Sequence, residues 1–84
     1  MKFNEKLKEL RKKKNLTQEE LAEKLFVTRT AVSKWESGKG YPSIERLKEL
    51  SIFYEISIDD LLSNEELIDY SIKIVRNERD NSSS

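Results

Sequence analysis

The stretch from Thr17 to Gly38 constrains the fold most, because it predicts two short helices joined by a tight turn. Thr17 is followed three residues later by Glu20, as in a capping box, where a hydroxyl and a carboxylate each accept a hydrogen bond from a free backbone N–H. A helix is therefore expected to begin at about Gln18. Its apolar residues recur at the spacing of one helix face, and this stripe consists of Leu21, Ala22 and Leu25.

The second helix of the pair is expected over about residues 29–37. Thr28 offers an N-cap, and Gly38 stands where the end of a helix favours a residue in the left-handed conformation. At about 100° per residue, one side is apolar and the other is polar and basic. The apolar side consists of Ala31, Val32 and Trp35, and the polar side of Arg29, Thr30, Ser33, Lys34 and Ser37. Such a pair is typical of a helix-turn-helix that reads DNA, although an ordinary helical hairpin with a solvated outer face shows the same periodicity.

Three further patterns stand at fixed spacing along the chain: LTQEELAEKL, then V-T-x-x-x-V-S-K-W-E-x-G-K, then a proline and an amphipathic helix that ends in ISIDDLL. From about Phe3 to Leu62 the sequence resembles the Cro-like phage-repressor (XRE) family of helix-turn-helix regulators. The resemblance implies an all-α fold, with a five-helix lambda-repressor-like DNA-binding domain over residues 1–63. The helix-turn-helix motif is then expected at about residues 18–37.

Contacts with DNA are expected to be of two kinds, because phosphate contacts position a protein and base contacts give it specificity. We assign base reading in the major groove to Arg29, Thr30, Ser33 and Lys34. We assign phosphate contacts to Gln18, Thr28, Ser37 and Lys39. Lys12 to Lys14 either contact phosphate as well or only complement the dipole of the helix that they end. Tyr41 either donates its hydroxyl to a phosphate or covers the core.

The resemblance also implies a structural ion pair between Arg11 and Glu36, which would fix the angle between the first helix and the reading helix. Phe26 departs from the family pattern, which most often has glycine at this turn. If the turn requires a positive φ, a bulky residue there costs about 1 to 2 kcal/mol. Either the ring of Phe26 recovers this cost by packing, which we expect, or the turn differs from that of the family.

The first helix is expected from about Asn4, as its N-cap, to Lys14, and Ser43 is expected to cap the fourth. A sixth helix, beyond the minimal family fold, is expected over residues 64–77, with a polar tail at 78–84 that we expect to be disordered. Its wide apolar arc consists of Leu67, Ile68, Tyr70, Ile72, Ile74 and Val75, and its narrow polar band of Glu65, Glu66, Asp69, Lys73 and Arg76. Either this helix buries one face on its own domain and another on a second copy, or all of it packs on its own core.

Charge is segregated along the chain although its total is balanced, with 16 Lys and Arg against 16 Asp and Glu. Residues 1–41 contain eleven cations and six anions, a net charge of +5, and residues 42–84 carry the compensating −5. The half that holds the expected reading helix is therefore the basic one. This distribution favours a nucleic-acid partner, which the net charge alone does not.

Composition argues against an enzyme and against a cofactor or metal site. The chain has no histidine and no cysteine, and it contains neither a P-loop nor a G-x-S-x-G turn. No apolar run reaches the length of a membrane span or of a signal sequence, so we expect a cytoplasmic protein without a membrane partner. No small-molecule ligand is evident from the pattern.

The expected function is sequence-specific binding of double-stranded DNA that regulates transcription, most simply as a repressor. The expected partner is a near-palindromic operator bound by a homodimer, because the symmetry of the site mirrors that of the protein. Two alternatives stay open. One is an antitoxin-like DNA-binding partner of another protein, and the other is a protein-interaction module on the same fold.

Overall fold

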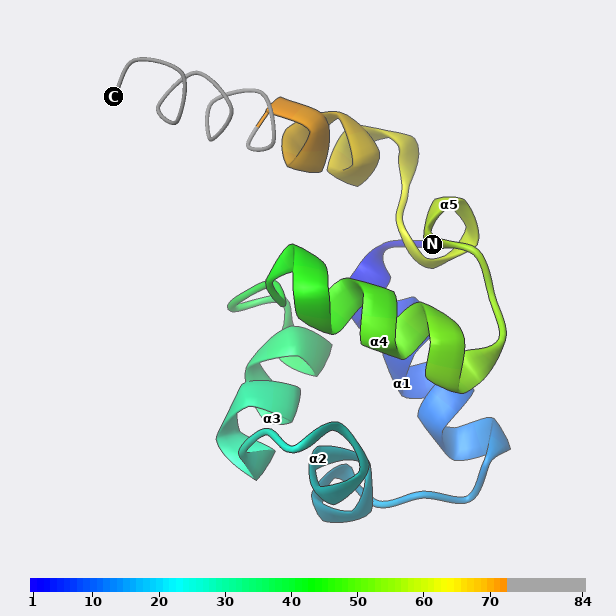
Figure 1. Cartoon of the computed structure of the whole chain (residues 1–84), viewed down its shortest axis with the longest axis vertical. Helices are drawn as coiled ribbons and strands as arrows, with labels where there is room; N and C mark the ends of the chain where they lie inside the picture. Colours follow the sequence, from blue (N-terminus) through cyan, green and yellow to red (C-terminus); the bar gives the residue numbers. More distant parts are fainter. Residues whose placement is uncertain (73–84) are drawn as a thin grey trace.

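The computed structural model describes residues 1–72, and these residues form an all-helical fold, which confirms the expected fold class (Figure 1). Five helices come first: α1 (Phe3–Lys13), α2 (Gln18–Leu25), α3 (Arg29–Ser37), α4 (Ile44–Tyr54) and α5 (Ile58–Leu61). Residues 64–72 are helical as well, and we call them the C-terminal helix. The remainder of the expected sixth helix and the expected disordered tail lie outside the described residues.

Side-chain caps set the helix boundaries that the sequence indicated. The Thr17 hydroxyl accepts a hydrogen bond from the Glu20 N–H at 3.1 Å, and the Glu20 carboxylate accepts one from the Thr17 N–H at 3.0 Å. The Thr28 hydroxyl at the start of α3 and the Ser43 hydroxyl at the start of α4 each accept a hydrogen bond from the backbone N–H three positions later. Each cap satisfies a backbone donor that the first turn of a helix leaves free.

The start of α1 differs from the expectation. The helix begins at Phe3 with Lys2 as its N-cap, so Asn4 lies inside the helix and does not cap it. Two contacts support this earlier start: the Glu5 carboxylate accepts from the Lys2 N–H at 3.3 Å, and the Phe3 N–H donates to a carboxylate oxygen of Glu66, 63 positions away, at 2.9 Å. A partner from the far end of the chain thus satisfies one of the free donors at this helix start, and no local pattern reveals it.

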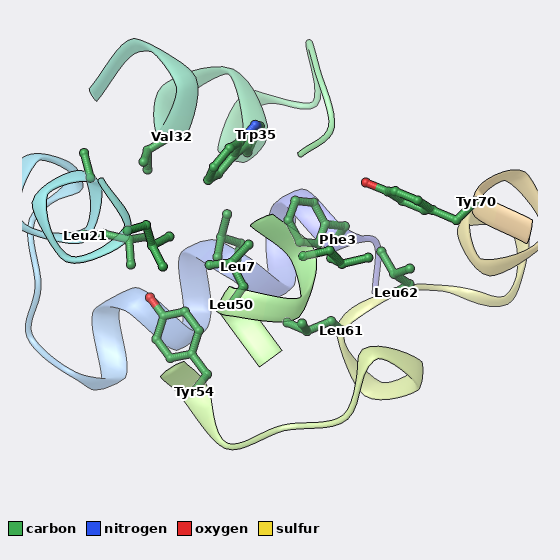
Figure 2. Packing of buried hydrophobic residues seen from close by; sticks show 13 residues of the cluster. Phe3, Leu7, Leu21, Val32, Trp35, Leu50, Tyr54, Leu61, Leu62 and Tyr70 are labelled. Carbon is green, nitrogen blue, oxygen red and sulfur yellow. The ribbon is translucent and has the colours of Figure 1, made fainter. Parts of the chain in front are cut away.

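The core is built from all six helical segments. Its fully buried side chains are Phe3, Leu7, Leu21, Val32, Leu50 and Leu61. Figure 2 shows Val32 and Trp35 pointing from α3 into this cluster, and Tyr70 extending from the C-terminal helix toward Phe3. α3 packs mainly against α1 and α2. Because the apolar side of α3 packs against these two helices, its opposite side faces outward.

The turn between α2 and α3 corrects one expectation. Phe26 has a φ of 56°, so the turn does require the left-handed conformation. Its side chain is 89% exposed, however, so the ring does not recover the cost by packing. Backbone hydrogen bonds stabilise the turn instead: the Phe26 N–H donates to the Glu23 carbonyl at 3.3 Å and the Val27 N–H to the Ala22 carbonyl at 3.0 Å. This pair of bonds is the Schellman arrangement at the end of a helix.

The C-terminal helix buries one face and leaves another outward. Tyr70 and Glu66 are 8% and 5% exposed, whereas Ile68 and Ile72 are 59% and 46% exposed. Glu66 therefore does not belong to the solvated polar band in which the sequence pattern placed it. Ile74, Val75, Lys73 and Arg76 lie outside the described residues. Within residues 1–72, none of the helices combines the length and the apolar character that crossing a membrane requires.

Candidate nucleic-acid interface

The outward face of α3 gathers most of the side chains that we assigned to DNA. The four residues assigned to base reading are all exposed, and they line one shallow surface hollow together with Ser37 and Lys39. They come from successive turns of a single nine-residue helix whose back is fixed in the core. These side chains carry hydroxyl, guanidinium and ammonium donors, which suit both base edges and phosphates.

An ion pair connects α1 to the buried edge of α3. The Arg11 Nε lies 2.7 Å from one carboxylate oxygen of Glu36, and its Nη2 lies 3.0 Å from the other. The Glu36 side chain is only 2% exposed. The hydrogen bond to Glu36 raises the pKa of Arg11 above its usual value. A two-point contact of this kind fixes direction as well as distance, so it sets the orientation of α3 on the scaffold.

The same arginine also holds the start of α2. Its Nη1 donates to the Leu16 carbonyl at 2.8 Å, just before the capping box. Gln18 joins the cluster, because its amide nitrogen donates to Glu36 at 3.2 Å. Gln18 is half-buried, and one N–H of its amide is used by the scaffold, so its phosphate role stays a prediction. Arg11 thus has a structural position, with its donors directed to the protein.

The three other residues assigned to phosphate differ in what their donors already do. Thr28 accepts a hydrogen bond from the Ala31 N–H at 3.1 Å, which leaves its hydroxyl hydrogen free to donate. Ser37 donates to the Lys34 carbonyl at 3.1 Å, so its hydroxyl has to rotate before it can donate to a phosphate. Lys39 is exposed next to the left-handed Gly38. The exposed N-terminus of α3 adds backbone N–H groups, which favour an anion.

The lysines at the end of α1 are exposed and have local contacts. The Lys13 ammonium lies 3.6 Å from the Glu9 carboxylate, and Lys14 lies 5.2 Å from the centre of the Phe53 ring. Both contacts are of kinds that contribute little at a surface. They leave the phosphate role of Lys12 to Lys14 as a prediction.

The contacts of Tyr41 favour the scaffold role over phosphate contact, although the residue is 46% exposed. Its hydroxyl donates to Glu66, and its ring lies 5.9 Å from that of Phe3 and 6.2 Å from that of Tyr70, measured between centres. The hydrogen bond to Glu66, helped by burial, raises the pKa of Tyr41 to about 12. Sequence reasoning missed this use of Glu66, although Ser63 and Glu66 have the spacing of a capping box and form one.

The comparison with known families decides the identity of the domain. The model of a helix-turn-helix family matches residues 7–61, a range that runs from α1 to the end of α5. The chain belongs to this family. It is a helix-turn-helix protein of the XRE type, as the motifs around α2 and α3 implied.

Related helix-turn-helix proteins include one named as a transcriptional activator and one named as a repressor. An HTH-type transcriptional activator of Enterococcus faecalis, BcrR, is 68% identical over 68 residues, which cover 81% of this chain and 33% of that protein. A phage transcriptional repressor of Vibrio cholerae, RstR, is 41% identical over 61 residues, which cover 73% of this chain and 54% of that protein. The chain thus spans about a third of the length of the activator and about half that of the repressor.

A solved structure supports the same fold. The crystal structure of a transcriptional regulator from Listeria innocua matches with a TM-score of 0.70 at 27% sequence identity. The match covers 93% of this chain and 94% of the other. It therefore includes the C-terminal part of this helix-turn-helix protein and not only the five helices of the family model.

Proposed function

We propose that this chain regulates transcription by binding specific sequences of double-stranded DNA, with α3 in the major groove. The observation that supports this most is the division of α3 into a buried apolar side and an exposed polar side. The Arg11–Glu36 ion pair holds this helix at a fixed angle, so the exposed side is presented as a rigid surface. The basic first half of the chain, with its net charge of +5, supplies attraction to the phosphates.

In this proposal, some side chains on and near α3 contact base edges and others contact phosphates. Arg29 or Lys34 donates to the O6 and N7 atoms of a guanine, and the Thr30 methyl group meets the methyl group of a thymine. Ser33 offers its hydroxyl to either kind of base edge. The phosphate contacts of Gln18, Thr28, Ser37 and Lys39 set the position of α3 along the groove, without contributing to the choice of sequence.

Whether binding represses or activates transcription then depends on where the bound DNA sequence lies relative to the promoter. A protein that covers a promoter excludes polymerase by occupying the same DNA, so repression needs no contact beyond DNA binding. Activation needs an additional contact with the polymerase. The names of the relatives include an activator and a repressor, and we take repression as the default for the domain by itself. Because DNA is its proposed ligand, we propose that the chain acts in the cytoplasm.

We further propose that the chain binds a near-palindromic operator as a homodimer. The support comes from the C-terminal helix, where Ile68 and Ile72 form an exposed apolar pair four residues apart. Two copies that join through these side chains cover them on both sides, as a two-fold contact requires. The two α3 helices then read half-sites about one helical turn of DNA apart.

Two substitutions on the proposed interface separate base reading from phosphate contact. Arg29→Ala should weaken binding to the preferred duplex by about 1 to 3 kcal/mol and relax the preference at one base pair. Lys39→Ala should weaken binding to all duplexes by a similar factor and reduce the slope of affinity against salt by about one. The measurement is a salt titration of Kd on the preferred duplex and on a scrambled one.

The matched control is Lys48→Ala, which removes an exposed lysine of α4 outside the hollow on α3. It should change neither the preference nor the salt slope by as much as Lys39→Ala does. Equal losses on the two duplexes for Arg29→Ala would contradict its role in base reading. No binding preference in the unsubstituted protein would contradict the proposed function as a whole.

A further inference from the structure

The loop between α3 and α4 carries Lys39 and has few backbone hydrogen bonds of its own. Among the described residues, the Lys39 N–H donates to the Lys34 carbonyl at 3.0 Å, and this is the only backbone–backbone bond recorded for residues 39–42. Gly40 adds conformational freedom within the loop. This bond holds the backbone of Lys39 at the end of α3, so contacts other than backbone hydrogen bonds must fix the rest of the loop, residues 40–42, which follows directly on Lys39.

The C-terminal helix supplies that support from the side of the loop that faces the core. The Tyr70 hydroxyl donates to the Pro42 carbonyl at 2.7 Å in a buried hydrogen bond. The ring of Tyr41 packs edge-on against Tyr70, at 82° between the planes, and on Phe3. Figure 2 shows Tyr70 reaching from its helix into the core beside Phe3. Two consecutive loop residues are thus attached to the same helix.

Glu66 adds hydrogen bonds to this attachment between the loop and the C-terminal helix. Its carboxylate is buried, yet it accepts hydrogen bonds from the Phe3 N–H at 2.9 Å, the Ser63 N–H at 2.9 Å and the Tyr41 hydroxyl. Burial opposes its ionisation, but the hydrogen bonds from Ser63, Tyr41 and Phe3 outweigh burial and lower the pKa of Glu66. One ionised group therefore links the start of α1, the loop and the C-terminal helix.

We propose that Tyr70 and Glu66 are positioning residues for DNA binding, which hold the loop of residues 39–42 so that Lys39 meets the phosphate backbone. Neither side chain touches DNA in this arrangement. The inference rests on the proposed function, since it concerns how strongly the same surface binds. It assigns to the C-terminal helix a role in affinity that the five-helix family match, which ends at residue 61, does not include.

The test is a double-mutant cycle between Tyr70→Phe and Lys39→Ala. Tyr70→Phe keeps the ring and removes only the hydroxyl that holds Pro42. It should weaken binding by up to about 10-fold, because the free energy of one neutral hydrogen bond is the upper limit of what ordering the released loop costs, and by the same factor on preferred and scrambled duplexes. In a Lys39→Ala background the loss should disappear, because the positioned group is absent.

Ser51→Ala is the matched control. It also removes a hydroxyl that donates to a backbone carbonyl, but that carbonyl belongs to Ile56, just after α4 and outside the α3–α4 loop. This variant should bind DNA as the unsubstituted protein does. Tyr41→Phe, which removes the donor to Glu66, gives a second and independent break in the same attachment and should weaken binding in the same direction. Amide hydrogen exchange at Lys39 and Gly40 should be faster in both Tyr70→Phe and Tyr41→Phe.

The outcomes separate this inference from the proposed function. If Tyr70→Phe accelerates exchange in the loop but leaves Kd unchanged, the positioning role is wrong while DNA binding stands. An equal loss from Tyr70→Phe with and without Lys39 would also overturn it, because the effect would then not act through that side chain. If Lys39→Ala alone leaves all binding unchanged, the assignment of Lys39 to phosphate fails, and this inference fails with it.

Discussion

Phe26 shows at the scale of one residue that a family pattern can change while the backbone stays the same. The turn keeps the left-handed conformation that glycine adopts without cost, and the ring of Phe26 lies almost wholly in solvent. Asn15 and Glu55 end α1 and α4 with nearly the same φ, at 57° and 53°. Of the three, only phenylalanine has a bulky ring and no polar group that could bond to the local backbone.

Phe26→Gly should therefore stabilise the protein. Removing the left-handed strain gains about 1 to 2 kcal/mol, and the greater freedom of glycine in the unfolded chain costs about 0.5 to 1 kcal/mol. The free energy of unfolding should rise by about 0.5 to 1 kcal/mol, measured by urea denaturation. Asn15→Gly is the matched control and should not raise it, because asparagine tolerates this conformation and no relief of strain offsets the greater freedom of glycine. A lower free energy of unfolding for Phe26→Gly would show that the exposed ring contributes stability after all.

At the scale of helices, the boundaries that were predictable are the ones with local causes. Thr17, Thr28 and Ser43 cap helices through residues three positions onward, so the pattern is legible in sequence. The partner of the Phe3 N–H at the start of α1 was not predictable, because Glu66 comes from the other end of the chain. The burial of Glu66 escaped prediction for the same reason, since only tertiary contacts supply its partners.

The same division applies to the candidate site. The polar face of α3 follows from helical periodicity, and the Arg11–Glu36 pair followed from the family resemblance. The use of Tyr41 and Tyr70 to hold the α3–α4 loop did not follow from either. Both side chains look like ordinary core residues in sequence, and their hydroxyls find partners 25 and 28 positions away.

The outward side of the C-terminal helix gives a prediction about assembly. Light scattering should give twice the mass of one chain for the unsubstituted protein. Ile68→Glu combined with Ile72→Glu should weaken the dimer by about 2 kcal/mol or more, because it places charges at the centre of the proposed contact. The double variant should then scatter as a monomer and bind a two-half-site operator less tightly.

Ile52→Glu provides the control for that experiment, since Ile52 is an exposed isoleucine of α4 with 77% of its surface accessible. It adds one negative charge, where the double variant adds two, at a place outside the C-terminal helix, and it should remain dimeric. A double variant that stays dimeric, or an unsubstituted protein that is a monomer, would contradict the proposed contact.

At the scale of the whole molecule, the chain has no net charge, but its positive and negative charges are concentrated in different halves. The basic half, residues 1–41, contains α1, α2 and α3, and the acidic half begins with α4. A dipolar protein of this kind is attracted to DNA with its basic half first, and the acidic half is repelled by the phosphates. Electrostatic attraction therefore also contributes to orientation and works in the same direction as the geometry of α3.

The central claim is that the exposed side of α3 reads base pairs, and selection from a pool of random duplexes tests it most directly. The chain should be incubated with the pool at moderate salt, and the bound duplexes recovered, amplified and sequenced over several rounds. The account predicts enrichment of one motif, with two inverted half-sites about one helical turn apart. A pool that remains random after selection, while the protein is shown to be folded, would contradict the claim.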